Sequence, residues 1–192
     1  VFFIGILVIA VLLAAQYITI PIENKIPTND LVTSKQGIEK LKEAQMTRSI
    51  VVVNVPAVDN QGNGVSTILK VEAIPGEGRI LTNINQLLFW VDTQYSIQTA
   101  KLVAENITNI NLSNVDLIYT IETEAQVIEG PSAGAALTLA TIAALENKSV
   151  NSSVVISGTI NLDGSVGPVG GILAKAKVSK DAGAKLFLVP EG

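Results

Sequence analysis

The pattern of apolar and polar residues divides the chain into an apolar N-terminal segment, a more polar connection and a mixed remainder. Residues 1–20 form an almost unbroken apolar run, and about twenty helical residues are needed to cross a bilayer core. We predict a transmembrane anchor or signal segment there, with a secretory signal and a buried core helix as alternatives to a retained anchor. Residues 21–48 are predicted to be a juxtamembrane linker. Within it, residues 30–46 could form a short helix that carries Leu31, Ile38, Leu41 and Ala44.

From residue 49 onward, runs of β-branched residues alternate with apolar positions three and four apart, which predicts both strands and helices. The predicted strands cover residues 49–55, 65–74, 79–81, 116–123, 154–162, 165–169 and 186–189, the last of them buried. The predicted helices cover residues 92–107, 135–145 and 172–182. Turn-forming residues at 59–64 and 163–164 predict two hairpins. This irregular alternation indicates an α+β or mixed α/β fold.

The composition excludes several classes of function. The net charge is −4, and no cluster of Lys or Arg provides the basic surface that a nucleic-acid backbone requires. The chain contains no cysteine and no histidine, which rules out thiol catalysis, a Ser-His-Asp triad and His- or Cys-ligated metals. We therefore predict no cofactor and no metal. Any serine nucleophile must transfer its proton to a carboxylate, a lysine or an amine.

One candidate nucleophile is Ser132, in the stretch Gly130-Pro131-Ser132-Ala133-Gly134. The apolar run that follows predicts a helix, so the hydroxyl would lie at a helix N-terminus, where free N–H groups favour developing negative charge. Pro131 suits the first turn of a helix. A tight strand-to-helix turn uses the same residue types, so this stretch alone leaves a structural role open.

Helical periodicity identifies a candidate base. Counted at about 100° per residue from Ile172, Lys175 falls on the same side as Ala176 and Ser179, whereas Lys177 and Lys180 fall on the opposite side. A lysine on the buried face could extend its ammonium to water. Alternatively, desolvation could keep the amine neutral and make it a base. Because the chain has no histidine, the second interpretation would pair Lys175 with Ser132 as a Ser-Lys dyad.

These residues carry a resemblance to the proteolytic domain of Lon proteases, peptidase family S16. The order and spacing agree across Gly130–Gly134, the stretch Ser157–Gly171 (SGTINLDGSVGPVGG), Lys175 and Ala182-Gly183. Glu72–Arg79 (EAIPGEGR) resembles an early hairpin of the same domain, so the similarity covers roughly residues 49–192. The chain stops short of the family's closing helix, which predicts a C-terminally incomplete proteolytic domain.

The resemblance implies that Ser132 is the acylated nucleophile and Lys175 the general base. Ser157 stands where the family has a threonine that helps hold the lysine, and Glu129 stands where Lon usually has an aspartate. Gly130 and Ala133 are expected to support the oxyanion. One departure is Thr159, which occupies the place of a family glutamate, so any role of that glutamate is lost.

The predicted function is that of an ATP-independent serine endopeptidase acting on unfolded or extended polypeptides. No Gly-x-x-x-x-Gly-Lys-Ser/Thr stretch is present, so the resemblance is greatest to archaeal ATPase-free, membrane-anchored or secreted Lon-like proteases. A non-catalytic surface or assembly protein and an autoprocessing factor are the alternatives. Lon-type domains often form hexameric rings, so a homo-oligomer is also expected.

Glycosylation acceptor patterns bear on the location of the domain. Four such tripeptides begin at Asn106, Asn111, Asn147 and Asn151. Together with the apolar N-terminal segment, they predict a single-pass membrane protein whose protease domain is extracytoplasmic. The alternative is that Asn and Ser simply occupy turns.

Overall fold

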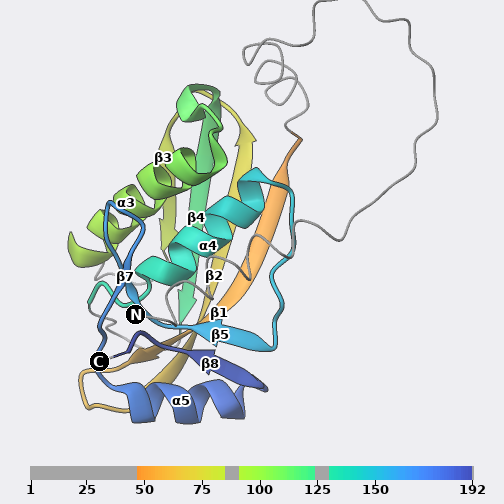
Figure 1. Ribbon diagram of the computed structural model, residues 1–192. Helices are drawn as coiled ribbons and strands as arrows, with labels where there is room; N and C mark the ends of the chain where they lie inside the picture. The colour runs from red at the N-terminus through yellow and green to blue at the C-terminus, as the bar shows by residue number, and fades with distance from the viewer. Residues whose placement is uncertain (1–46, 85–90, 124–129, 192) are drawn as a thin grey trace, which may run out of the picture. The chain divides into compact units, whose positions relative to one another are not determined.

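The computed structural model describes residues 47–84, 91–123 and 130–191 (Figure 1). The predicted anchor at 1–20 and almost all of the predicted linker at 21–48 therefore lie outside the described residues, as do Glu129 and the predicted helix at 30–46. Within the described residues, no helix is long and apolar enough to cross a bilayer. The structure is of mixed α and β type, which agrees with the predicted fold class.

A four-stranded sheet of order β1-β2-β4-β3 forms the centre of the domain. β1 (Ser49–Val58) and β2 (Gly64–Pro75) form an antiparallel hairpin in which Val58 pairs with Gly64. β4 (Val115–Thr123) pairs antiparallel with β2 and parallel with β3 (Ile80–Ile84). The predicted hairpin and strands are confirmed, because β-branched alternation and an Asp-Asn-Gln-Gly-Asn-Gly turn are strong local signals.

Two helices cover one face of this sheet. α3 (Val91–Thr108) connects β3 to the parallel strand β4, with the 3-10 turn η1 (Leu112–Asn114) between α3 and β4. α4 (Gly134–Leu145) packs against α3 and against β1 and β2, as Figure 1 shows. Alternate strand residues point toward these helices, and the buried core includes Val51, Val55, Leu69, Val71, Leu117, Tyr119, Ile97, Ala100, Leu137 and Ala140.

The remaining elements are two small sheets and a third helix. β5 (Val154–Ile156) pairs parallel with β8 (Leu186–Leu188), and β6 (Thr159–Ile160) pairs antiparallel with β7 (Val166–Gly167). α5 (Ile172–Asp181) follows β7 and packs against β1 and β2. The predicted helix at 172–182 is confirmed to within one residue.

Three local predictions are wrong. The strand predicted at 154–162 is two strands, because Ser157 and Gly158 turn toward Ser132 instead of continuing one ladder. The strand predicted at 165–169 shrinks to β7 for lack of further partners in the described residues. The last strand, β8, is not buried: among the described strands it pairs only with β5, and Leu186 is exposed.

Candidate active site

Ser132 lies in a tight turn immediately before α4. Gly130 has φ 92°, a left-handed conformation that glycine adopts without strain. The Gly134 N–H donates to Pro131 O at 3.0 Å and closes the turn. Helix α4 then begins at Gly134, with Ala133 as its N-cap residue at φ −85° and no side-chain cap. Pro131 therefore precedes the helix and does not occupy its first turn, which corrects the sequence prediction.

The backbone of residue 158 fixes this turn from both sides. Gly158 N–H donates to Ser132 O at 3.0 Å, and Ala135 N–H donates to Gly158 O at 2.9 Å. A Cβ on Gly134 would lie 2.7 Å from Ile160 Cγ2 and 2.8 Å from Ile160 N, so the glycine allows β6 to approach the start of α4. The first turn of the helix is thus held against the segment that carries Ser157.

Lys175 reaches the same point from α5. Its side chain is almost fully buried, with 3% of the residue exposed. Nζ lies 2.9 Å from Ser132 Oγ and 3.2 Å from Ser157 Oγ, both within hydrogen-bonding distance. The Ser157 hydroxyl, itself buried, also donates to Ser132 O at 3.3 Å. Three elements that are distant in sequence therefore bring two hydroxyls to one amine.

Burial determines the electrostatics of Lys175. Desolvation lowers the pKa of its ammonium below the usual lysine value. Among the described residues, no Asp or Glu forms an ion pair with Lys175 that would oppose this shift. A lysine that is buried among serine hydroxyls, and that forms no ion pair with the described carboxylates, is suited to act as a neutral base.

Of the other residues of the predicted site, the structure describes Gly130, Ala133 and Ser157. Gly130 and Ala133 flank Ser132 in the turn, and Ser157 contacts both Ser132 and Lys175. Glu129 lies outside the described residues. Nowhere in residues 47–84, 91–123 and 130–191 do three or more His, Cys, Asp or Glu side chains converge as a metal ion would require.

Sequence reasoning missed the two glycines that position α5. A Cβ on Gly64 would collide with the carbonyl oxygen of Ala174, and a Cβ on Gly171 would lie 2.6 Å from Val58 Cγ2. Both contacts hold the helix of Lys175 against the end of the β1–β2 hairpin. Gly64 resembles an ordinary turn glycine in the sequence, so only the tertiary contact reveals its role.

A Gly64→Ala substitution is expected to lower the reactivity of Ser132, although the added methyl group meets Ala174 and Val178 and not the dyad itself. The added methyl group must push the α5 backbone away, and a displacement of about 1 Å at reacting groups can cost roughly 100-fold in rate. The readout is the second-order rate constant for modification of Ser132 by a serine-reactive phosphonate. The control is Gly170→Ala, where a Cβ meets no atom within 4 Å. Equal rates for both variants would contradict the role assigned to Gly64.

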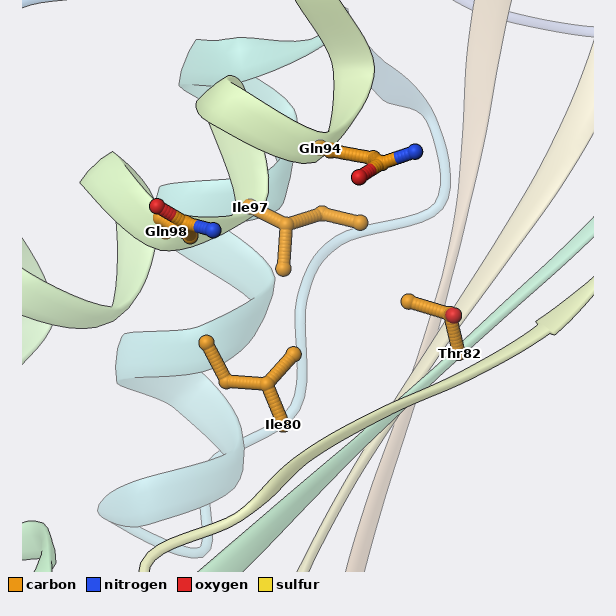
Figure 2. A pocket seen from close by; sticks show the side chains of 5 residues that line it. All are labelled: Ile80, Thr82, Gln94, Ile97 and Gln98. Atoms are coloured by element: carbon orange, nitrogen blue, oxygen red, sulfur yellow. The ribbon is translucent and has the colours of Figure 1, made fainter. Parts of the chain in front are cut away.

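A separate pocket lies between β3 and α3 (Figure 2). It has a volume of about 290 Å³ and is lined by Ile80, Thr82, Gln94, Ile97 and Gln98. Figure 2 shows Ile80 and Ile97 extending toward each other from the sheet and the helix. The lining includes no ionisable side chain and neither Ser132 nor Lys175, so this pocket adds nothing to the chemistry of the dyad.

A buried Ser-Lys pair beside a helix N-terminus is one of the arrangements that serine hydrolases use. The family model of the Lon protease (S16) C-terminal proteolytic domain matches residues 27–192. The chain therefore belongs to the family of Lon protease C-terminal proteolytic domains, as the resemblance predicted.

Individual relatives agree with this assignment. The chain is 27% identical to the archaeal Lon protease of Thermoplasma acidophilum over 183 residues, which cover 93% of this chain and 28% of that protein. It is 28% identical over 144 residues to the archaeal Lon protease of Methanothermobacter thermautotrophicus, covering 72% of this chain and 22% of that protein. The Lon protease of Phenylobacterium zucineum is 35% identical over 128 residues, which cover 64% of this chain and 16% of that protein. The chain thus spans less than a third of the length of these relatives.

Proposed function

We propose that this domain is a serine peptidase in which Ser132 is the nucleophile and Lys175 the general base. The observation that carries the proposal is the 2.9 Å approach of Lys175 Nζ to Ser132 Oγ, made by a lysine that is buried and has a lowered pKa. A structural lysine would more often extend its ammonium to water or pair it with a carboxylate. Family membership supports the same chemistry.

The mechanism follows from this geometry. Neutral Lys175 takes the proton of Ser132 as Oγ attacks the carbonyl carbon of the scissile peptide bond. Lys175 then returns that proton to the leaving amine as the tetrahedral intermediate collapses to an acyl-enzyme. In the second half, Lys175 deprotonates a water molecule that attacks the ester, and the proton returns to Ser132 Oγ as the acid is released.

Supporting groups have separate roles in this scheme. Ser157 Oγ, 3.2 Å from Lys175 Nζ, holds the amine in line with Ser132 Oγ in both protonation states. We assign stabilisation of the oxyanion to backbone N–H groups around Gly130 and Ala133, a role supported by their position at the positive end of α4. These roles make Ser157 a positioning residue, whereas Ser132 and Lys175 carry the bond-making steps.

The proposed substrates are unfolded or extended polypeptides, cleaved without ATP. The proposed steps use only Ser132, Lys175 and water, so none of them consumes a nucleotide. An extended substrate can bind next to Ser132 by adding main-chain hydrogen bonds to a strand edge.

A homo-oligomeric ring stays a prediction, which sedimentation velocity would check.

The decisive experiment measures cleavage of an unfolded casein-type substrate by the chain without nucleotide. Wild-type protein is expected to cleave it, and Ser132→Ala is expected to lose at least about 1,000-fold in rate. The matched control is Ser152→Ala, because Ser152 is an exposed serine in another loop. Cleavage by Ser132→Ala at the wild-type rate would overturn the proposal. An inert wild-type chain that also fails to react with a phosphonate would favour a non-catalytic role.

The pH dependence of catalysis should report Lys175. Because burial lowers the pKa of its ammonium, the neutral base becomes available below the pH at which an exposed lysine would lose its proton. The value of kcat/KM is expected to rise as pH rises through that lowered pKa and then to level off before the pH at which an exposed lysine loses its proton. A rate that keeps rising up to the ordinary lysine pKa near 10.4 would contradict this expectation.

We further propose that the domain is extracytoplasmic and tethered through residues 1–20. In support, the side chains of Asn106, Asn111, Asn147 and Asn151 are all exposed. Thr108, however, is buried in α3 and donates to Ala104 O at 2.7 Å, so the tripeptide at Asn106 is the least accessible acceptor. Glycopeptide mass spectrometry of protein isolated from its own membranes should find sugar at Asn111, Asn147 or Asn151 in preference to Asn106. Protein without any glycan would contradict this proposal.

A further inference from the structure

The pocket between β3 and α3 lies beside an edge of the central sheet (Figure 2). β3 is the last strand in the order β1-β2-β4-β3, so one of its two edges has no strand partner among the described residues. β1, at the other end of the sheet, packs against α5 and β5. The sequence of β3, Ile80–Ile84, contains no charged residue and no proline, which are features that commonly keep edge strands from pairing with other chains. The free edge of β3 is therefore suited to accept another strand.

The hydrogen bonds between β3 and β4 identify the main-chain groups that face this edge. Leu117 N–H of β4 donates to Arg79 O at 3.0 Å, so the main-chain groups of Arg79 point toward β4. Neighbouring residues of a strand direct their N–H and C=O groups to opposite sides. The groups of Leu81 therefore also point toward β4, whereas those of Ile80 and Thr82 point toward the free edge. These two residues offer two donors and two acceptors in the spacing that an extended peptide backbone can pair with.

The side chains of the same two residues line the pocket, together with three residues of α3. Ile80 and Ile97 supply apolar contacts, and Ile97 is buried. Gln94 and Gln98, one helical turn apart, are exposed and supply amide donors and acceptors. A charged group that entered this pocket would be desolvated without meeting an opposite charge in the lining. The pocket therefore suits an uncharged side chain.

The free edge of β3 leads toward the end of the sheet at which the dyad lies. β3 runs parallel to β4, and β4 ends at Thr123, opposite Thr67 of β2. Three residues before Thr67, Gly64 meets the carbonyl of Ala174 in the helix that carries the lysine of the dyad. The pocket itself contains neither residue of the dyad. A long polypeptide can thus be held at two separate places, and binding at one raises its effective concentration at the other.

We propose that the free edge of β3 and its pocket form a second binding site, which holds an extended segment of the polypeptide substrate away from the scissile bond. The segment pairs with the main-chain groups of Ile80 and Thr82 and places an uncharged side chain in the pocket. That this segment belongs to a substrate rests on the proposed peptidase function, whereas its binding does not. The site favours long unfolded chains over short peptides, because only a long chain reaches both places.

Binding of fluorescein-labelled unfolded casein to the full chain tests the edge. Fluorescence anisotropy is measured in a Ser132→Ala background, so that no cleavage takes place. Thr82→Pro removes an N–H group that faces the edge and leaves the hydrogen bonds to β4 in place, so the Kd for casein should rise at least about fivefold. Thr82→Val is the matched control, because it keeps this N–H group, and its Kd should stay within about twofold of the background value. Equal Kd values for Thr82→Pro and Thr82→Val would overturn the proposal.

A second variant tests the pocket without changing the backbone of β3. Gln98→Glu places a carboxylate at the pocket, where it must lose water when an uncharged side chain enters, so the Kd for casein should rise at least about threefold. Gln61→Glu adds the same charge at an exposed turn and should leave the Kd unchanged. Equal Kd values for these two variants would contradict the role of the pocket. A dimer that forms without casein and that Thr82→Pro dissociates would assign the edge to a second copy and overturn the proposal.

Kinetics of the active chain separate this site from the dyad. Thr82→Pro should raise KM for unfolded casein and leave kcat unchanged, while kcat/KM for a tetrapeptide and the rate of phosphonate modification of Ser132 stay at their wild-type values. An equal loss with the tetrapeptide would show that Thr82→Pro disturbs the dyad, and the proposal would be wrong. If wild-type chain cleaves nothing but Thr82→Pro still weakens casein binding, the peptidase function fails and the binding site stands.

Discussion

Replacing Lys175 with methionine is expected to abolish peptide hydrolysis and to make the fold more stable. The loss in kcat/KM should reach at least about 1,000-fold, since Lys175 is assigned both proton-transfer steps. Methionine fills similar space without an amine that must be desolvated. The gain in stability should be about 1 kcal/mol, or roughly 2–4 °C in Tm for a domain of this size. Cleavage assays and thermal unfolding of the same preparations would check both effects.

The stability gained by Lys175→Met should decrease as pH rises. The pKa of Lys175 is lower in the folded protein than in the unfolded chain, so the unfolded chain binds more protons between the two values and wild-type stability rises with pH there. The advantage of Lys175→Met is therefore largest below the folded pKa and shrinks as pH approaches the unfolded lysine value. Lys177→Met, an exposed change on the same helix, should alter neither activity nor Tm. A destabilised Lys175→Met protein would indicate a structural lysine.

The largest loss of stability is expected from Asp116→Asn. Asp116 is 1% exposed, and its carboxylate accepts from the N–H groups of Glu77 and Arg79 at 2.8 and 2.9 Å. The Arg79 side chain adds contacts at 2.9 and 2.6 Å. An amide oxygen cannot accept all four hydrogen bonds, so some of these N–H groups lose their charged acceptor. Because Arg79 is largely exposed, the ion pair itself contributes less than a buried one would. We expect a clear fall in the urea concentration at the unfolding midpoint.

The difference in stability between wild type and Asp116→Asn should disappear in acid. The hydrogen bond from the Arg79 side chain, followed by the two backbone N–H groups, holds the pKa of Asp116 far below its usual range. A carboxylate of this kind contributes stability above the unfolded pKa near 3.9 and loses it as pH falls toward the folded value. The gap between wild type and Asp116→Asn should thus be constant above about pH 5 and narrow below pH 4. Asp181→Asn, at an exposed position on α5, should have little effect at any pH.

Much of the fold follows from local sequence signals. β-Branched alternation located β1, β2 and β4, and turn residues located both hairpins. Helical periodicity placed Lys175 on the buried side of α5, although Ile172, the reference position for that face, is 42% exposed. The first turn of α5 is covered less than the periodicity suggested, because burial depends on which neighbours reach the helix as well as on its own pattern.

The features that sequence reasoning missed depend on partners far away in the chain. The interruption at Ser157 and Gly158 follows from hydrogen bonds to Ser132, 25 residues earlier in the case of Ser157. Gly64 reads as a turn residue, and only its contact with Ala174 O connects it to the site. The exposure of β8 follows from its place at the edge of a two-stranded sheet. Propensity carries no information about such long-range contacts.

The main-chain hydrogen bonds that join Gly158 to Ser132 and Ala135 have a consequence for how this site can change during evolution. Both hydrogen bonds of Gly158 involve peptide groups alone, so their formation does not require any particular side chain at the neighbouring position 159. That position, where the resemblance to Lon implies a glutamate, is Thr159 here, yet Ser132 and Lys175 still meet at 2.9 Å. In the proposed mechanism, a nucleophile located by backbone lets the residues around it vary, so the specificity of the site could diverge while the proposed proton-transfer geometry is kept.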